Sequence, residues 1–245
     1  MTQLAPEGSD PAAVAADDLV DAMAALVGHH DYPCLGARSV FRRERATVRV
    51  YSELGSSESV DHLLQDLQEF AGVVEAGEGF ASFVAIFRGP VIVDEEHFEG
   101  LSWSQLRGLH RVDQHAWNAG VSADPNDPHF AFSAGGTPFF VVGLHPQASR
   151  DARRAATPTL VFNLHEQFEA LRESGQFPRM RDRIRQRDEH LQGSVNPMVA
   201  DYGEGSEARQ YSGRHVASAW QAPFEAQTVV PTAPTSPTAP TPLRS

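Results

Sequence analysis

The chain has 245 residues, 41% of them hydrophobic, and a formal net charge of −12. This length allows one sizeable hydrophobic core, and the acidic charge argues against nucleic-acid binding, which needs a continuous basic face to replace counterions. The chain contains no lysine, and arginine supplies all of its Lys/Arg residues. A Schiff-base lysine and the phosphate-binding lysine of a P-loop are therefore excluded.

The number of cysteines and the hydropathy of the chain indicate its cellular compartment. Cys34 is the single cysteine, which excludes an intrachain disulfide and cysteine-rich zinc or iron–sulfur sites and is typical of a reducing cytoplasm. Neither a signal-peptide pattern nor a run of about 18 apolar residues occurs, so we expect a cytoplasmic protein with no membrane partner. Composition predicts a disordered extension over 1–15, a folded domain over 16–225 and a disordered Pro/Thr-rich tail over 226–245.

Hydrophobic periodicity predicts a mixed succession of helices and strands. In chain order we expect a helix over 18–28, a loop over 29–39, a strand over 46–54, a helix over 57–70, a strand over 81–87, a helix over 95–118, strands over 130–133, 139–144 and 160–164, and helices over 166–173 and 179–192. The charges of the last helix are typical of a solvated face. The segment 193–214 is rich in glycine and polar residues and is expected to be a long functional loop.

Turn signals and missing motifs indicate the fold class. Gly135-Gly136 lies between two predicted strands and is a hairpin signal, so the sheet should be partly antiparallel. No dinucleotide-binding, P-loop or α/β-hydrolase motif is present. The pattern predicts an α+β fold, a single domain with a central, partly antiparallel sheet and helices packed on it.

Two predicted strands each end in a histidine. His145 follows the strand over 139–144, and His165 follows the strand over 160–164. Because a buried strand delivers its last side chain to the rim of a sheet, we expect the two imidazoles to converge on one pocket or metal. The arginines between them, which suit an anionic cofactor, are Arg150, Arg153 and Arg154.

Several chemistries are open to such a pair of histidines. The sequence HEQFE places Glu169 where a zinc metalloprotease has its second histidine, which argues against that enzyme class. A non-haem iron site could take His145, His165 and either Glu166 or Glu169. A cysteine hydrolase would need a base beside Cys34. The candidate bases are His29, His30, His145 and His165. Each histidine could also be structural, with its ring bonded to the backbone.

Five long blocks of sequence carry a resemblance that is more specific than any short motif. They are YPCLGARS at 32–39, ADPNDPHFAFSAGG at 123–136, FFVVGLHPQASRDARR at 139–154, LVFNLHEQFEALRESGQF at 160–177 and IRQRDEHLQGSVNPMVADYGEGSEARQYSGR at 184–214. With these blocks the chain resembles the YqcI/YcgG family over most of its length. The resemblance implies a haem-dependent monooxygenase that N-hydroxylates a guanidino or amino group of a small amino-acid-like substrate in natural-product biosynthesis.

The same resemblance implies a haem b cofactor, O2 as co-substrate and a separate electron donor, since the chain has no flavin or nicotinamide fingerprint. Two alternatives are a non-catalytic haem-binding or sensing protein and a non-haem iron oxygenase. Relatives often carry a cysteine before the final Pro-Phe pair, where this chain has Ala222. If that cysteine takes part in catalysis, we expect this member to be impaired.

Roles for individual residues follow from the resemblance. The axial ligand of the haem would be His145, with His165 as the second choice and Cys34 as a thiolate alternative. The propionates would be held by Arg150, Arg153 and Arg154. A cationic substrate in a largely dry pocket needs carboxylates, which the long loop offers. The candidate carboxylates are Asp201, Glu204 and Glu207, and the candidate partners of a substrate carboxylate are Arg209 and Arg214.

Overall fold

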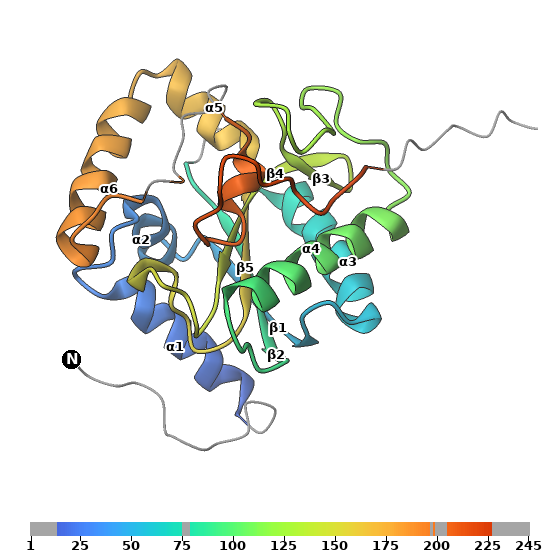
Figure 1. Cartoon of the computed structure of the whole chain (residues 1–245), viewed down its shortest axis with the longest axis horizontal. Helices are drawn as coiled ribbons and strands as arrows, with labels where there is room; N and C mark the ends of the chain where they lie inside the picture. Colours follow the sequence, from blue (N-terminus) through green and yellow to red (C-terminus); the bar gives the residue numbers. More distant parts are fainter. Residues whose placement is uncertain (1–13, 75–78, 197, 199–204, 227–245) are drawn as a thin grey trace, which may run out of the picture.

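The computed structural model describes residues 14–74, 79–196, 198 and 205–226. Over these residues a five-stranded sheet runs through the molecule, and helices cover both of its faces (Figure 1). The strands are β1 (Ala46–Glu53), β2 (Ser82–Gly89), β3 (Phe132–Ala134), β4 (Thr137–Leu144) and β5 (Thr159–Leu164). The helices are α1 (Ala16–Gly28), α2 (Leu35–Arg42), α3 (Ser57–Val73), α4 (Glu95–Val112), α5 (His165–Glu173) and α6 (Phe177–Gln192), with the short 3-10 helices η2 (Asp151–Arg153) and η3 (Glu207–Gln210). The predicted single α+β domain is confirmed, while most of the two predicted tails lies outside the described residues.

The sheet is mixed. Its strand order is β1-β2-β5-β4-β3, in which β1 and β2 are parallel and all other neighbours are antiparallel. The predicted hairpin joins β3 to β4, and its two glycines, Gly135 and Gly136, have φ values of 59° and 74°. Glycine adopts two consecutive positive φ values at little cost, which is what a tight hairpin turn needs. The partly antiparallel sheet is therefore confirmed.

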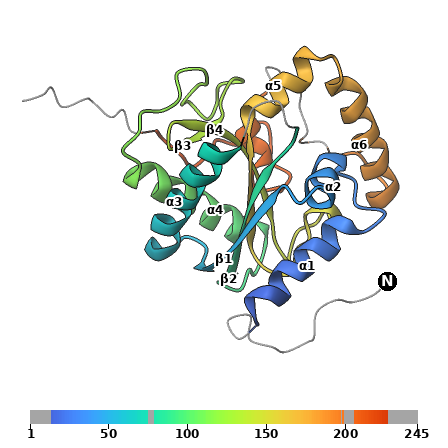
Figure 2. The ribbon, with the colours of Figure 1, turned by 180° about the vertical axis from the view of Figure 1, so that it is seen from behind.

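The two faces of the sheet have different partners, because successive side chains of a strand point to opposite sides. On one face Phe83 of β2, Val141 of β4 and Phe162 of β5 join the main core with α3 and α4. On the other face Val84 of β2 and Val161 of β5 pack in a second cluster with α1. Figures 1 and 2 show α3 and α4 on one side of the sheet and α1, α2 and α6 on the other.

Helix α2 lies where the sequence pattern predicts a loop. It follows Pro33 directly and begins with Cys34 as its N-cap, whose Sγ accepts a hydrogen bond from the Ala37 N–H at 3.4 Å. Serine, threonine, asparagine and aspartate are the usual caps. A helix capped by a thiol therefore lacks the ordinary sequence signal of a helix start.

Helix α4 ends at Val112, six residues before the end expected from the pattern. The Asp113 carboxylate accepts hydrogen bonds from the N–H groups of His115 at 2.9 Å and Gly135 at 2.6 Å. These bonds turn the chain out of the helix and tie it to the β3–β4 hairpin. With 18 residues, α4 is the longest of the described helices, and none of these is long and apolar enough to cross a bilayer.

Candidate ligand pocket

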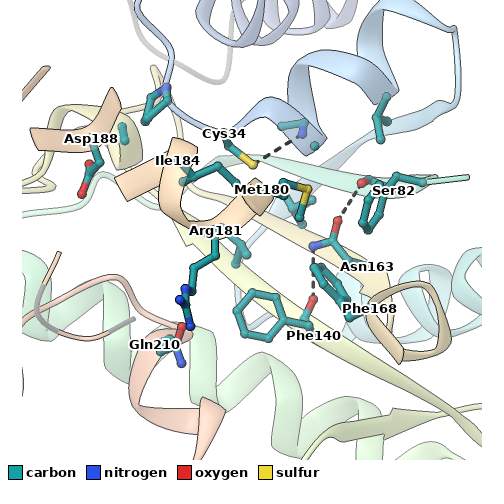
Figure 3. Close-up of a pocket in the computed structure, with 18 of the residues that line it drawn as sticks. Cys34, Ser82, Phe140, Asn163, Phe168, Met180, Arg181, Ile184, Asp188 and Gln210 are labelled. Atoms are coloured by element: carbon teal, nitrogen blue, oxygen red, sulfur yellow. Dashed lines mark hydrogen bonds between the residues drawn. The ribbon is translucent and has the colours of Figure 1, made fainter. Parts of the chain in front are cut away.

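A largely apolar cavity of about 300 Å³ lies between the second face of the sheet and the helices that cover it. Its floor consists of alternate strand residues, among them Val84 of β2, Val142 of β4 and Val161 of β5. Helices α2 and α6 close it from above, and Met180 and Ile184 of α6 lie over the sheet near Cys34 (Figure 3). We call this cavity the pocket.

Helix α6 covers the pocket without tight packing. Of its 16 residues, only Asp188 is buried. Asp188 Oδ2 pairs with Arg150 Nη2 at 2.7 Å, and Arg187 donates to the backbone carbonyl of Tyr32 at 3.1 Å. The second half of α6 is therefore held over the pocket by polar contacts, and its first half contributes apolar side chains and arginine stems to the lining.

One end of the pocket holds Tyr32, Cys34 and Arg153. Burial raises the pKa of the Cys34 thiol more than its hydrogen bonds from backbone N–H groups lower it, and burial also raises the pKa of Tyr32. Arg153 donates from Nη1 to the Gly143 carbonyl at 3.0 Å, and burial lowers the pKa of its guanidinium. Because a nucleophile or a thiolate ligand must be the anion, a neutral thiol disfavours both roles for Cys34.

His165 lies toward the opposite end, as the first residue of α5 directly after β5. Its Nε2 is 3.7 Å from Glu169 Oε1, and Arg172 forms an ion pair with the same carboxylate. Burial lowers the pKa of His165, and this effect exceeds the opposite effect of Glu169. The ring is therefore neutral at pH 7, which is the form that binds a metal ion.

Glu207 reaches the pocket from η3. The residue is 6% exposed, and the Tyr211 hydroxyl lies 2.5 Å from its Oε1. Burial raises the pKa of Glu207 to about 8, while Tyr211 and Arg172 lower it to a smaller extent. At neutral pH this carboxyl group is mainly protonated. The other two predicted carboxylates, Asp201 and Glu204, lie outside the described residues.

The two strand-end histidines do not converge. Strands β4 and β5 are antiparallel, with Leu144 opposite Thr159. His145 and His165 therefore leave the sheet at opposite ends, roughly 20 Å apart at about 3.4 Å per residue. The prediction of one shared pocket or metal is wrong for this reason, and so is an iron site built on both histidines.

His145 is buried beside the sheet, outside the pocket lining, and is only 1% exposed. Its ring stacks on Phe98 with a centroid distance of 4.2 Å. Burial lowers the pKa of His145 to about 4, although Glu95 acts in the opposite direction. Neither ring nitrogen has a hydrogen-bond partner among the described residues. His145, the first choice of haem ligand from the sequence, therefore lies outside the pocket, and His165, the second choice, lines it.

Of the three arginines predicted to hold a cofactor, Arg153 lines the pocket and the other two do not. Arg150 is paired with Asp188, and Arg154 donates twice to the backbone carbonyl of Ala148 within its own loop. Arg150 and Arg154 therefore fix the loop after β4, a structural role in place of the predicted contact with a cofactor.

The two arginines predicted to bind a substrate carboxylate also lie outside the pocket lining. Arg209 donates to the backbone carbonyl of Ala217 at 2.7 Å and lies over the ring of Trp220. Arg214 pairs with the buried Glu99 of α4 at 2.7 Å. Both side chains thus hold the C-terminal segment against the domain.

The sequence pattern did not single out three lining arginines, which are Arg172, Arg181 and Arg185. Two of them belong to the helix interpreted as a solvated face. The available signal is the spacing of Met180 and Ile184, four residues apart, which marks a narrow apolar stripe flanked by arginines. Figure 3 shows Arg181 extending from α6 toward Gln210.

Another group of possible ligands lies at the end of α1. His29, His30 and Asp31 each place one ligand atom within 4.8 Å of the others. Both histidines are exposed, and three neighbouring residues of one loop leave most of the coordination sphere open. We therefore assign no metal ion to this cluster.

Comparison with known proteins gives one family and two relatives. Residues 23–225 match the model of the YqcI/YcgG family. The chain is 26% identical over 189 residues to the Bacillus subtilis (strain 168) protein YcgG, an alignment that covers 74% of this chain and 75% of the relative. It is 25% identical over 189 residues to YqcI of the same organism, covering 74% of each chain. Both relatives are described as uncharacterized proteins. No solved structure matches significantly.

Proposed function

The chain belongs to the YqcI/YcgG family, and from this membership together with the pocket we propose that it is a haem-dependent monooxygenase that hydroxylates a guanidino or amino nitrogen of a small amino-acid-like molecule. One observation carries the proposal. A single largely apolar cavity is lined by a neutral imidazole, by arginines and by a buried carboxyl group, contributed by His165, Arg153 and Glu207. These are the groups that a haem with two propionates and a basic substrate require.

The residue types of the pocket fit a haem. His165 has a neutral ring that could hold the haem iron, and the valines and phenylalanines of the lining would supply apolar contact to a porphyrin. The arginines that line the pocket and could contact the propionates are Arg153, Arg172, Arg181 and Arg185. The volume lies at the lower end of the range for small-molecule sites, roughly 300–1,000 Å³. Haem binding would therefore push Met180 and Ile184 outward with α6, in which Asp188 is the single buried residue.

Bound haem would supply the activation of O2, with electrons from a separate donor. The side chains of the protein would then position the substrate nitrogen and exclude water from the pocket. The apolar floor of Val84, Val142 and Val161 offers no hydrogen bonds to water. Two described carboxyl groups line this space, and Asp188 is already paired with Arg150, which leaves Glu207. A basic nitrogen of the substrate would be held by Glu207.

The test is a titration of the purified full chain with haem, followed by absorption. We expect a saturable Soret band and, with reductant, O2 and a panel of arginine-like and amine compounds, a product heavier by one oxygen atom. A protein that stays colourless after titration would overturn the proposal. A Soret band without a hydroxylated product would point to the non-catalytic haem-binding protein.

A further inference from the structure

Glu207 and Tyr211 form a buried pair that connects the pocket with the edge of the sheet. The carboxyl group belongs to the pocket lining, and the Tyr211 ring is packed in the main core. The Tyr211 hydroxyl lies 2.5 Å from Glu207 Oε1, accepts a hydrogen bond from the Phe132 N–H at 3.1 Å and lies 3.4 Å from the Phe139 carbonyl. The hydroxyl therefore has two acceptors within reach and a single proton to donate.

This geometry supports two proton arrangements. When Glu207 is protonated, its O–H donates to the Tyr211 oxygen and the Tyr211 O–H turns to the Phe139 carbonyl. When Glu207 is ionised, the Tyr211 O–H turns to Oε1 and stabilises the carboxylate. In both arrangements the Tyr211 oxygen remains the acceptor of the Phe132 N–H, and the exchange moves the Tyr211 O–H between the Phe139 carbonyl and the Glu207 carboxylate.

We propose that Glu207 is the acid–base group of the pocket, protonated in the resting protein and able to pass its proton to a basic atom of a bound molecule. In this step the O–H bond of the carboxyl group breaks, a bond between that proton and the ligand atom forms, and the negative charge stays on Glu207. The Tyr211 O–H then donates to the carboxylate, and Arg172 of α5 supplies positive charge nearby. Ligand and Glu207 end as an ion pair in a site of low polarity, where such a pair is strong.

The charged and titratable surroundings favour the protonated resting state. Burial opposes ionisation of the carboxyl group, raising its pKa to about 8, and the groups that act against burial are Tyr211 and Arg172. Arg172 already pairs with Glu169, so its charge is shared between two carboxyl groups. A base that enters the pocket and accepts the proton becomes a cation beside Glu207. This cation stabilises the ionised carboxylate, which has too little positive charge near it in the resting protein.

The consequence concerns the substrate class, and in this respect the inference rests on the proposed function. The ligand would enter with its basic nitrogen unprotonated. At pH 7 this is a minor form of an amine and a far smaller fraction of a guanidine, so the proton step favours an amine. A quaternary ammonium group cannot accept the proton and would be disfavoured. The proton step itself needs neither haem nor O2.

The test follows the carboxyl group by infrared spectroscopy of the full chain without added haem. We expect a carbonyl stretch of a protonated carboxyl group at pH 7 that is absent from Glu207→Gln and titrates with a midpoint near pH 8. Because the Tyr211 hydroxyl stabilises the ionised form, Tyr211→Phe should move the midpoint upward. A wild-type spectrum without the band, or a midpoint that Tyr211→Phe leaves in place, would overturn the pair as described.

The second arm uses benzylamine, a compact base with an apolar ring, at pH 7. Benzylamine should remove the protonated band and raise the carboxylate band. Benzyl alcohol, which has a similar shape and no basic nitrogen, should leave the spectrum unchanged. Benzyltrimethylammonium, which carries a positive charge but cannot accept a proton, should leave it unchanged as well. A band that persists at saturating benzylamine shows that the proton is not available to the pocket and refutes the proposal. A positive result in a protein that binds no haem would keep this inference and remove the proposed oxygenase.

Discussion

Arg150 and Asp188 form an ion pair of 2.7 Å whose side chains are only 11% and 10% exposed. The pair joins the loop after β4 to α6, and Asp188 also accepts a hydrogen bond from the Asn196 N–H at 2.9 Å. A buried pair of this kind is costly to break because the remaining charge is left without its partner. This ion pair therefore holds α6 in place over the pocket.

Asp188→Asn should loosen α6 and expose Cys34, which lies beneath it in the pocket. Loss of one partner of a buried pair costs about 3–5 kcal/mol, and 1.4 kcal/mol corresponds to about a factor of ten in an opening equilibrium. We therefore expect a thiol reagent to modify Cys34 at least about tenfold faster in this variant than in the wild type.

The matched control is Asp182→Asn, which removes an acidic residue of the same helix. The Asp182 side chain is 60% exposed and pairs with Arg181 at the surface, an arrangement worth about 0–1 kcal/mol. Its rate of Cys34 modification should equal that of the wild type. Equal rates in Asp188→Asn and the wild type would mean that the pair does not hold α6.

The buried His145 should make the fold sensitive to acid. Its pKa is lowered to about 4 by burial, so the unfolded chain binds a proton below about pH 6.5 that the folded chain does not bind. The contribution of His145 to stability is therefore fully present above pH 6.5 and is lost as the pH drops toward 4, by up to about 1.4 kcal/mol per pH unit. Burial lowers the pKa of His165 as well, which adds a loss in the same direction. Glu207, whose pKa is raised to about 8, acts in the opposite direction.

His145→Phe removes the titrating ring and keeps an aromatic side chain against Phe98. Urea unfolding at pH 7.5 and pH 5 should show a smaller difference in the free energy of unfolding for this variant than for the wild type. The control is His62→Gln, a change at an exposed position of α3, which should leave the pH dependence unchanged. An unaltered pH dependence in His145→Phe would assign the acid sensitivity to other groups.

Local patterns predict most elements of this fold but not the direction of its strands. The apolar runs over 139–144 and 160–164 are nearly the observed β4 and β5, and Gly135-Gly136 marks the hairpin. The prediction that His145 and His165 converge assumed that both strands end at the same edge of the sheet. The connection between β4 and β5 contains no helix longer than η2, and parallel neighbours usually need a helical crossover. The missing helix was the available signal for antiparallel pairing.

The part of the pocket that sequence reasoning did not find depends on tertiary contacts. A run of arginines such as that of α6 looks the same in sequence whether its members face water or a cavity. The burial of Glu207 comes from its contact with Tyr211 and the sheet, which its polar surroundings in the sequence do not indicate. Cys34, Arg153, His165 and Glu207 could be picked out because their residue types are chemically distinctive.

Gly143 should tolerate no side chain, because the C-terminal segment crosses β4 at this point. Its N–H donates to the Tyr211 carbonyl at 2.7 Å, and a Cβ at this position would lie 2.7 Å from the same oxygen and 2.6 Å from Phe98 Cε1. Gly143→Ala should therefore lower the free energy of unfolding by about 1–3 kcal/mol, the usual cost of overpacking. Chemical denaturation measures this change directly.

Gly100→Ala provides the opposite case in the same chain. Gly100 lies inside α4, and a Cβ there meets nothing within 4 Å. Alanine is favoured over glycine in a helix interior by about 0.8–1 kcal/mol, so this variant should be as stable as the wild type or more stable. If both variants had the same effect, the close approach at Gly143 would not limit stability.

The assignment of the haem ligand can be tested apart from folding by chemical rescue. His165→Gly removes the imidazole that lines the pocket, and the haem titration should then give a weak or shifted Soret band. Added imidazole can enter the space left by the side chain and should restore the band. His145→Gly removes a ring outside the pocket lining and should leave the shape of the Soret band unchanged in the fraction that folds, with no response to imidazole. Rescue of His145→Gly in place of His165→Gly would return the ligand to the end of β4 and overturn the assignment to the pocket.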